Sequence, residues 1–320
     1  MKVPARQLLV PLSFLLLGMA GESMEPPPIP LPVADGSWRP LCECGDAALQ
    51  RKLEDAMQEN ALWQSLIEQE KMAVGVIDLT HPQSPRFAQI NGMTMMYAAS
   101  LPKVGVLLAA QVCFEDGSLK ATQPIYDDLV AMIRISDNSA ATRMIRRIGL
   151  ERIQAILTDP RYRFYDKDQG GGIWVGRAYA GGGDNHPDPI KGLSHAANVN
   201  QVCRFYYLLA TGRLINPKAS REMLEVLSMP ALHTAFVDAL ERIAPTARLY
   251  RKSGNWKIWQ SDSMLVWDDL WRRYILVAMV EHPKGDRILK ELAPVVDGIL
   301  KPKGTLLAAS PAGGDTFPKR

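Results

Sequence analysis

Apolar residues recur along most of the chain with the period of a helix or of a strand, and turn residues separate these segments. Helical spacing predicts helices over residues 46–69, 101–114, 125–134, 138–148, 150–157, 195–211, 217–227, 232–242 and 286–300. Short apolar or alternating runs predict strands over residues 72–79, 87–97, 247–253, 263–267 and 274–281. A Pro-Gln-Ser-Pro segment joins the first two strands and favours a hairpin between them.

The order of these elements predicts the architecture. One helix and two strands come first, a block of helices follows, and three strands and a last helix close the pattern. We expect an α+β domain over residues 45–301, with an antiparallel sheet of about five strands flanked by N- and C-terminal helices. The block of helices forms an all-helical subdomain inserted between the second and third strands.

Periodicity is lost over residues 159–194. Two glycine triplets, at 170–172 and 181–183, enclose an aromatic segment, and Pro187 and Pro189 follow. Loops of this length in compact domains are often functional, so this segment is a candidate part of a binding site.

The two ends of the chain are expected to lie outside the domain. Lys2 and Arg6 precede the apolar run from Leu8 to Ala20, which predicts a secretory signal peptide over residues 1–20. This run is short for a membrane span, so export to the periplasm or the medium is favoured over a retained anchor, and we expect no stable span after cleavage. Residues 21–44 are predicted as a Pro-rich extended linker and residues 302–320 as a disordered tail.

Composition narrows the possible partners. The chain is 47% hydrophobic and 22% charged with a net charge of +3, which does not indicate nucleic acid or an anionic membrane as a partner. The four cysteines, at 42, 44, 113 and 203, lack the second half of a zinc site, and the five histidines form no metal motif. We expect a monomer without metal or cofactor, with Cys113 and Cys203 either buried as free thiols or bridged.

The first candidate for chemistry is Ser100-Leu-Pro-Lys103, where a strand candidate gives way to an apolar helix. Residues three apart at the start of a helix share a face, so the Lys103 amine can take the Ser100 proton if it is sufficiently neutral. Alternatively, Ser100 is only the cap of the helix, and the two roles are compatible.

Two further motifs follow in order. In Ser136-Asp137-Asn138, Ser136 can relay a proton and the Asn138 amide can hold a substrate carbonyl, although a helix cap explains the motif equally well. In Lys252-Ser253-Gly254, Lys252 and Ser253 can bind a substrate carboxylate, and Gly254 lets a substrate backbone approach. The N–H of the next residue, Asn255, would form an oxyanion hole with the Ser100 N–H. An edge strand and a turn are the structural alternative.

The three motifs and their surroundings resemble the class A β-lactamase and penicillin-binding-protein family of serine hydrolases. The resemblance covers about residues 46–300 and includes AASLPKVGVLLAA, SDNSAATRMI and LYRKSGNW. It implies a β-lactamase-like fold and a β-lactam or D-alanyl peptide as substrate. It assigns roles to five residues: Ser100 as nucleophile, Lys103 as base, Ser136 as proton relay, and Lys252 and Ser253 as carboxylate binders.

Two departures from the family pattern stand out. Ser100 and Ser136 are only 36 positions apart, which predicts a shortened helical subdomain, and residues 159–194 contain no glutamate to act as the deacylating base. The replacement candidates are Asp166, Asp168, Asp184, His186 and Asp188, of which Asp184 and His186 are favoured.

Three hypotheses follow for the function. A serine β-lactamase is the first, a D-alanyl-D-alanine peptidase the second, and a non-catalytic, acyl-trapping β-lactam-binding module the third. Trp256 and Trp259 are expected either in the substrate cleft or in the core.

Overall fold

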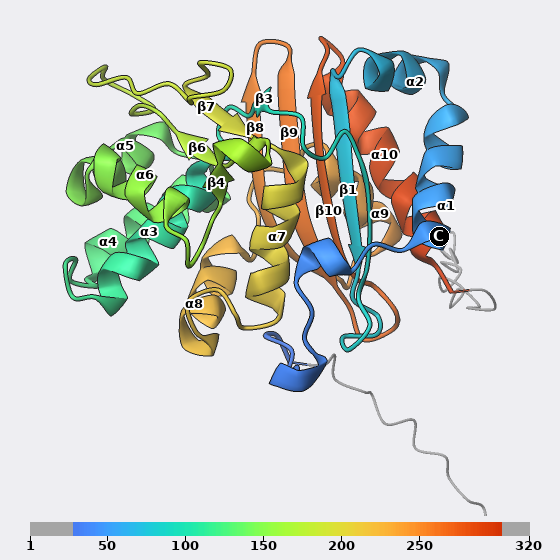
Figure 1. The fold of residues 1–320 in the computed structure, drawn as a ribbon, viewed down its shortest axis with the longest axis horizontal. Helices are drawn as coiled ribbons and strands as arrows, with labels where there is room; N and C mark the ends of the chain where they lie inside the picture. The colour runs from blue at the N-terminus through green and yellow to red at the C-terminus, as the bar shows by residue number, and fades with distance from the viewer. Residues whose placement is uncertain (1–27, 303–320) are drawn as a thin grey trace, which may run out of the picture.

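The computed structural model describes residues 28–302, and its centre is a five-stranded antiparallel sheet with the strand order β2-β1-β10-β9-β8 (Figure 1). Its strands are β1 (Met72–Asp78), β2 (Arg86–Ile90), β8 (Arg248–Trp256), β9 (Trp259–Trp267) and β10 (Arg273–Glu281). The predicted antiparallel sheet of five strands is therefore confirmed.

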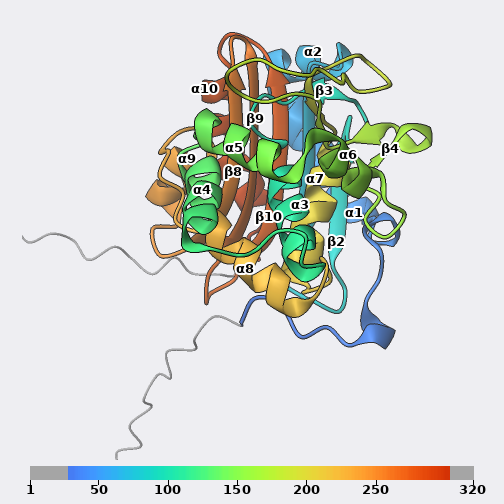
Figure 2. The same ribbon diagram turned by 90° about the vertical axis from the view of Figure 1, so that its left-hand side faces the viewer.

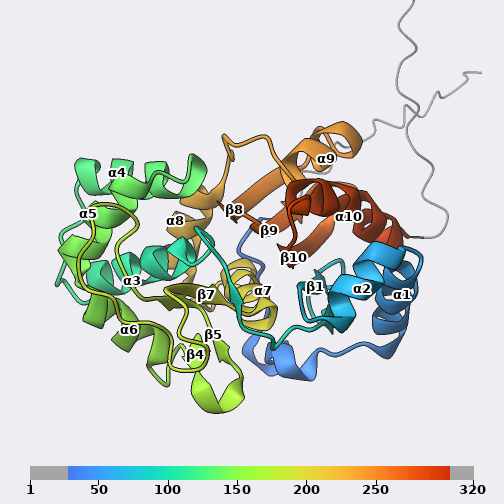
Figure 3. The same cartoon turned by 90° about the horizontal axis from the view of Figure 1, so that it is seen from above.

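Side chains alternate across this sheet and supply two separate cores. Ala73 and Ile77 of β1 belong to one core, while Val74 and Val76 belong to the other, as expected where successive side chains point to opposite faces. One face is covered by α1 (Ala47–Gln58), α2 (Ala61–Glu68), α9 (Phe236–Ile243) and α10 (Gly285–Leu300). Helix α7 (Val199–Ala210) covers the opposite face, between the sheet and the remaining helices (Figure 3).

The all-helical subdomain lies beside the β8 edge of the sheet (Figures 1 and 2). It contains α3 (Lys103–Glu115), α4 (Gln123–Arg134), α5 (Asn138–Ile148), α6 (Leu150–Thr158) and α8 (Pro217–Leu227). Helix α3 is buried along almost its whole length, which explains why its sequence is apolar on every face. The insertion of this subdomain between the second and third sheet strands is confirmed.

Several predicted boundaries are wrong. The helix expected over 46–69 is two helices, because the Asn60 side chain accepts N–H groups of Leu62 and Trp63 and starts a new one. The strand expected over 87–97 divides into β2 and a short β3 (Met96–Tyr97), since Asn91 has a φ of 51° and turns the chain. The helix expected over 232–242 begins only at Phe236.

The largest difference concerns residues 195–211, for which apolar spacing predicts one helix. His195–Ala197 is strand β7, which pairs with β3 and with β6 (Trp174–Val175) in a three-stranded sheet. A two-stranded sheet joins β4 (Tyr165–Asp166) and β5 (Gly171–Gly172), and short 3-10 helices span Asp35–Ser37, Leu41–Glu43 and Lys167–Gln169.

The segment before α1 is packed on the domain where it is described. Leu31 and Leu41 are buried, and the Leu31 N–H donates to the carbonyl of Ala210 at 2.7 Å. Residues 28–44 of the predicted linker thus contact the domain and include two short 3-10 helices. The predicted signal peptide and residues 303–320 of the predicted tail lie outside the described residues.

Two further predictions concern cysteines and membrane spans. All four cysteines are free thiols in the structure; Cys42 is exposed, while Cys44, Cys113 and Cys203 are buried. Within residues 28–302, the search for a helix of the length and apolarity that a bilayer crossing needs finds none.

Candidate active site

The three sequence motifs meet at the junction of the helical subdomain and the sheet. Ser100 precedes α3, Ser136 lies in the connection between α4 and α5, and Lys252 lies on β8. The Lys252 Nζ donates to the Ser136 Oγ at 2.9 Å, which links two motifs that are 116 positions apart in sequence. Ser136 has a φ of 59°, a strained conformation that the surrounding contacts hold.

Lys103 is completely buried beside Ser136. Its Nζ donates to the Ser136 carbonyl at 2.7 Å and to the Asn138 Oδ1 at 2.8 Å, and lies 3.5 Å from the Ser136 Oγ. Burial lowers the pKa of Lys103 to about 7, with the nearby Asp137 carboxylate acting in the opposite direction. The amine is therefore about half neutral near neutral pH.

Lys252 is also buried, and burial lowers its pKa, with Lys103 and Arg251 adding repulsion. The neighbouring Arg251 points to the other face of the strand, where its Nε and Nη2 donate to the Asp262 carboxylate at 2.8 and 2.7 Å. This buried ion pair joins the middle of β8 to β9. Ser136 thus lies between two lysines, Lys103 and Lys252, whose charged forms are both disfavoured.

Gly254 lies directly against the backbone that carries Ser100. A β-carbon at residue 254 would fall 2.3 Å from the Ala98 carbonyl oxygen and 2.7 Å from the Ser100 nitrogen. Ala98 itself is fixed, since its carbonyl accepts the Ser261 hydroxyl at 2.9 Å. Within residues 28–302 the Ser100 N–H has no hydrogen-bond partner, which leaves it free to donate to a ligand.

Substitution of Gly254 by alanine is therefore expected to displace Ser100 and lower its acylation rate by about 100-fold. The rate constant of covalent labelling by a β-lactam measures this effect. The matched control is Gly298→Ala on α10, where an added β-carbon meets nothing within 4 Å. That control should keep the wild-type labelling rate and gain roughly 0.5–1 kcal/mol of stability. Equal labelling rates in the two variants would contradict the expectation.

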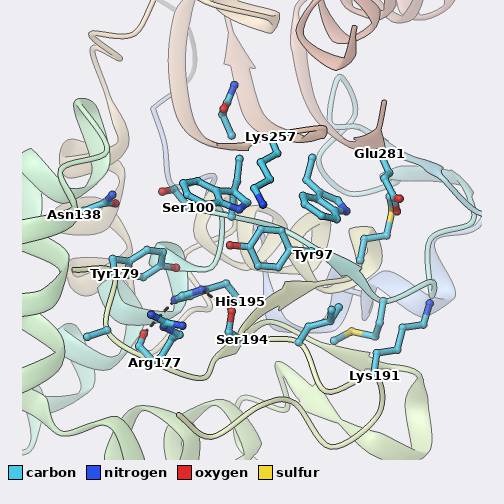
Figure 4. A pocket seen from close by; sticks show the side chains of 18 of the residues that line it. Tyr97, Ser100, Asn138, Arg177, Tyr179, Lys191, Ser194, His195, Lys257 and Glu281 are labelled. Carbon is cyan, nitrogen blue, oxygen red and sulfur yellow. Dashed lines mark hydrogen bonds between the residues drawn. The ribbon is translucent and has the colours of Figure 1, made fainter. Parts of the chain in front are cut away.

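Ser100 lies between two cavities. The larger is a cleft of about 650 Å³ lined by Ser100, Asn138 and Asn255 together with Tyr97, Tyr179, His195 and Trp259 (Figure 4). The smaller, of about 300 Å³, is lined by Ser100, Ser136, Ser253, Gly254 and Asn255, among others. The structure thus brings together all eight candidate site residues: Ser100, Lys103, Ser136, Asn138, Lys252, Ser253, Gly254 and Asn255.

The two tryptophans after the third motif line the larger cleft and not the core. Trp256 is 54% exposed, and the Trp259 ring lies edge-on to Tyr97 with centroids 5.3 Å apart. Ser100 and Glu281 lie at different ends of the same cleft (Figure 4).

None of the acid–base candidates from residues 166–188 lines either cavity. Asp166 pairs with Arg163, and Asp168 and Asp184 are exposed. Asp188 is buried but accepts the N–H groups of residues 190, 191 and 193 within its own loop. The His186 ring faces Gln154. The expectation that Asp184 or His186 acts beside Ser100 is therefore not supported by their positions.

The loop contributes other residues to the cleft, which no sequence motif indicates: Arg177, Ala178, Tyr179, Lys191, Leu193 and Ser194, followed by His195 of β7. The His195 Nε2 lies 3.1 Å from the Arg177 carbonyl, which can only accept, so this nitrogen carries the proton. Burial lowers the pKa of His195 to about 4, so the ring is neutral near pH 7. Among described residues, the carboxylates that line the two cavities are Glu70, Glu281 and Asp286, all outside the loop.

The fold and these motifs define a class of proteins: β-lactamases and penicillin-binding proteins. Residues 124–296 match a family model described as the β-lactamase enzyme family. The chain belongs to this family. No curated protein is similar enough in sequence to count as a match.

Solved structures support the fold at low sequence identity. A β-lactamase from Sphaerobacter thermophilus is 14% identical, with a TM-score of 0.58 over 79% of this chain and 95% of that one. PBP-A is 15% identical, with a TM-score of 0.57 over 79% and 95%. A point mutant of PBP-A, solved as an acyl-enzyme complex with penicillin G, is 16% identical, with a TM-score of 0.58 over 81% and 96%.

Proposed function

We propose that this protein is an exported serine hydrolase that is acylated by β-lactams at Ser100 and releases the acyl group slowly. The position of the Ser136 hydroxyl between the Lys103 and Lys252 amines is the main support. A hydroxyl in this position can pass a proton between a base beside Ser100 and a leaving nitrogen in the cleft.

The acylation step then proceeds as follows. Neutral Lys103 takes the proton of the Ser100 hydroxyl as its oxygen attacks the lactam carbonyl carbon. The Ser100 and Asn255 N–H groups stabilise the oxyanion. When the ring C–N bond breaks, the nitrogen receives the Ser136 proton, and Lys103 returns a proton to Ser136. No atom leaves, because the opened ring stays attached through the new ester.

Polar groups around Ser100 suggest how a substrate is bound. The Asn138 Oδ1 is occupied by Lys103, so its Nδ2 remains to donate to a substrate carbonyl. Ser253 lines the smaller cavity, and the Lys252 Nζ lies beside Ser136, another residue of that lining. Ser253 and Lys252 are proposed to bind the substrate carboxylate. The approach of β8 to Ser100 at Gly254 supports binding of an extended substrate beside the strand.

Slow release is proposed because the loop over residues 159–194 brings no carboxylate to the cleft. Hydrolysis of the ester needs a base that activates water, and neutral His195 is already bonded through both ring nitrogens. A D-alanyl peptide presents the same carbonyl and carboxylate to Ser100, so a slow D-alanyl-D-alanine peptidase is the second candidate.

The intact mass of the protein, followed over time after addition of benzylpenicillin, tests the proposal. We expect one adduct with the full mass of the drug that persists long after labelling is complete. Rapid loss of the adduct while the drug is consumed would indicate a β-lactamase with a base among Glu70, Glu281, Asp286 and His195. Absence of any adduct would contradict acylation of Ser100 by this drug.

A further inference from the structure

Tyr179 and His195 both line the cleft and lie close to each other in it (Figure 4). The Lys103 Nζ lies 4.5 Å from the centroid of the Tyr179 ring. The same ring packs on His195, with centroids 4.1 Å apart and planes inclined by 31°. The ring thus lies directly against the amine that faces Ser136.

Hydrogen bonding by the Tyr179 hydroxyl does not explain where this side chain lies. It is buried and has no hydrogen-bond partner among the described residues. A buried hydroxyl without a partner is unfavourable, so the contacts of the ring must hold the side chain in place. The adjacent backbone adds support, because the Ala180 N–H donates to the Thr142 Oγ1 of α5 at 2.9 Å.

We propose that Tyr179 is a positioning residue that seals the Lys103 amine from water and thereby keeps it free to take the proton of Ser100. This inference rests on the proposed role of Ser100 and Lys103 in acylation. It gives the glycine-rich loop a function in the reaction, although that loop supplies no carboxylate to the cleft.

The charges around Lys103 do not account for its neutral form by themselves. Asp137 favours the charged Lys103 amine, the charge of Lys103 lowers the pKa of Lys252, and His195 is neutral near pH 7. Burial is the largest cause of the low pKa of Lys103. The π face of Tyr179 attracts a cation, but the same ring excludes the water that would solvate it. The two effects of the ring therefore oppose each other, and burial of the amine favours its neutral form.

A titration of Lys103 in the full chain tests whether Tyr179 seals its amine from water, and this measurement does not depend on turnover. The Cε–Hε signals of ¹³C-labelled lysine are recorded across pH, and Lys103→Arg identifies the Lys103 signal. We expect a wild-type midpoint near 7. Tyr179→Phe keeps the ring and should keep that midpoint. Tyr179→Ala admits water and should raise the midpoint by about one pH unit or more.

Tyr179→Leu serves as a second test if the alanine variant does not fold. Leucine excludes water but has no π face, so the midpoint should stay at or below that of the wild type. A raised midpoint in the leucine variant, or an unchanged one in a folded alanine variant, would overturn the inference. Penicillin labelling of the wild type, measured separately, tests the proposed function, so the two can fail independently.

Discussion

Replacement of Ser100 with alanine is expected to abolish covalent labelling by benzylpenicillin while the fold survives. The only atom removed is the Oγ proposed to form the ester, and Ser100 is partly exposed between two cavities, so its loss disturbs little packing. Intact mass after incubation with the drug measures the labelling, and circular dichroism with a thermal melt measures the fold.

A serine close to the site provides the control for this experiment. Ser139 is exposed on the first turn of α5, directly after Asn138, and it lines neither cavity. Ser139→Ala should label at the wild-type rate. Labelling that persists in Ser100→Ala would remove Ser100 as the nucleophile and would direct attention to another hydroxyl of the cleft, such as Ser194.

Replacement of Lys103 with arginine is expected to lower the labelling rate by about 10²–10⁴-fold, the usual contribution of a general base. Arginine preserves the positive charge and can still donate to Ser136 and Asn138. It cannot accept a proton near neutral pH, because its guanidinium is always protonated. A labelling rate close to that of the wild type would show that the charge of Lys103, and not its basicity, is what acylation needs.

The pH dependence of labelling in the wild type tests the same role. The pKa of Lys103 is lowered to about 7, so the neutral base is lost as the pH falls through 7. The labelling rate should therefore be about tenfold below its plateau at pH 6, and it should be nearly constant above pH 8. A rate that keeps rising up to pH 10 would indicate a lysine with its ordinary pKa.

Local patterns in the sequence were sufficient to predict the central sheet and the three motifs. Each sheet strand is a short apolar run bounded by turn residues, and each motif lies within five residues along the chain. Their order alone placed the helical subdomain between the second and third strands. The sequence by itself also determined that residues 159–194 contain no glutamate.

Which loop residues reach the cleft depended on the tertiary structure, because the loop has no period that relates one position to another. As polar residues after three glycines, Asp184 and His186 are the favoured candidates in the sequence, yet neither lines a cavity beside Ser100. Tyr179 and His195 line the cleft instead. His195 was assigned to a helix because it continues an apolar helical pattern, but pairing with β3 and β6 draws it into a strand.

The proton affinity of Lys103 also depended on the tertiary structure. Ser-x-x-Lys spacing determines that Ser100 and Lys103 are near each other at the start of a helix. It does not determine whether the amine is buried, because the groups that enclose it, Ser136, Asn138 and Tyr179, come from distant segments. The sequence thus determined which candidate reacting groups are present. Only the packing of distant segments around these groups decided how far each is exposed to water, and therefore its charge.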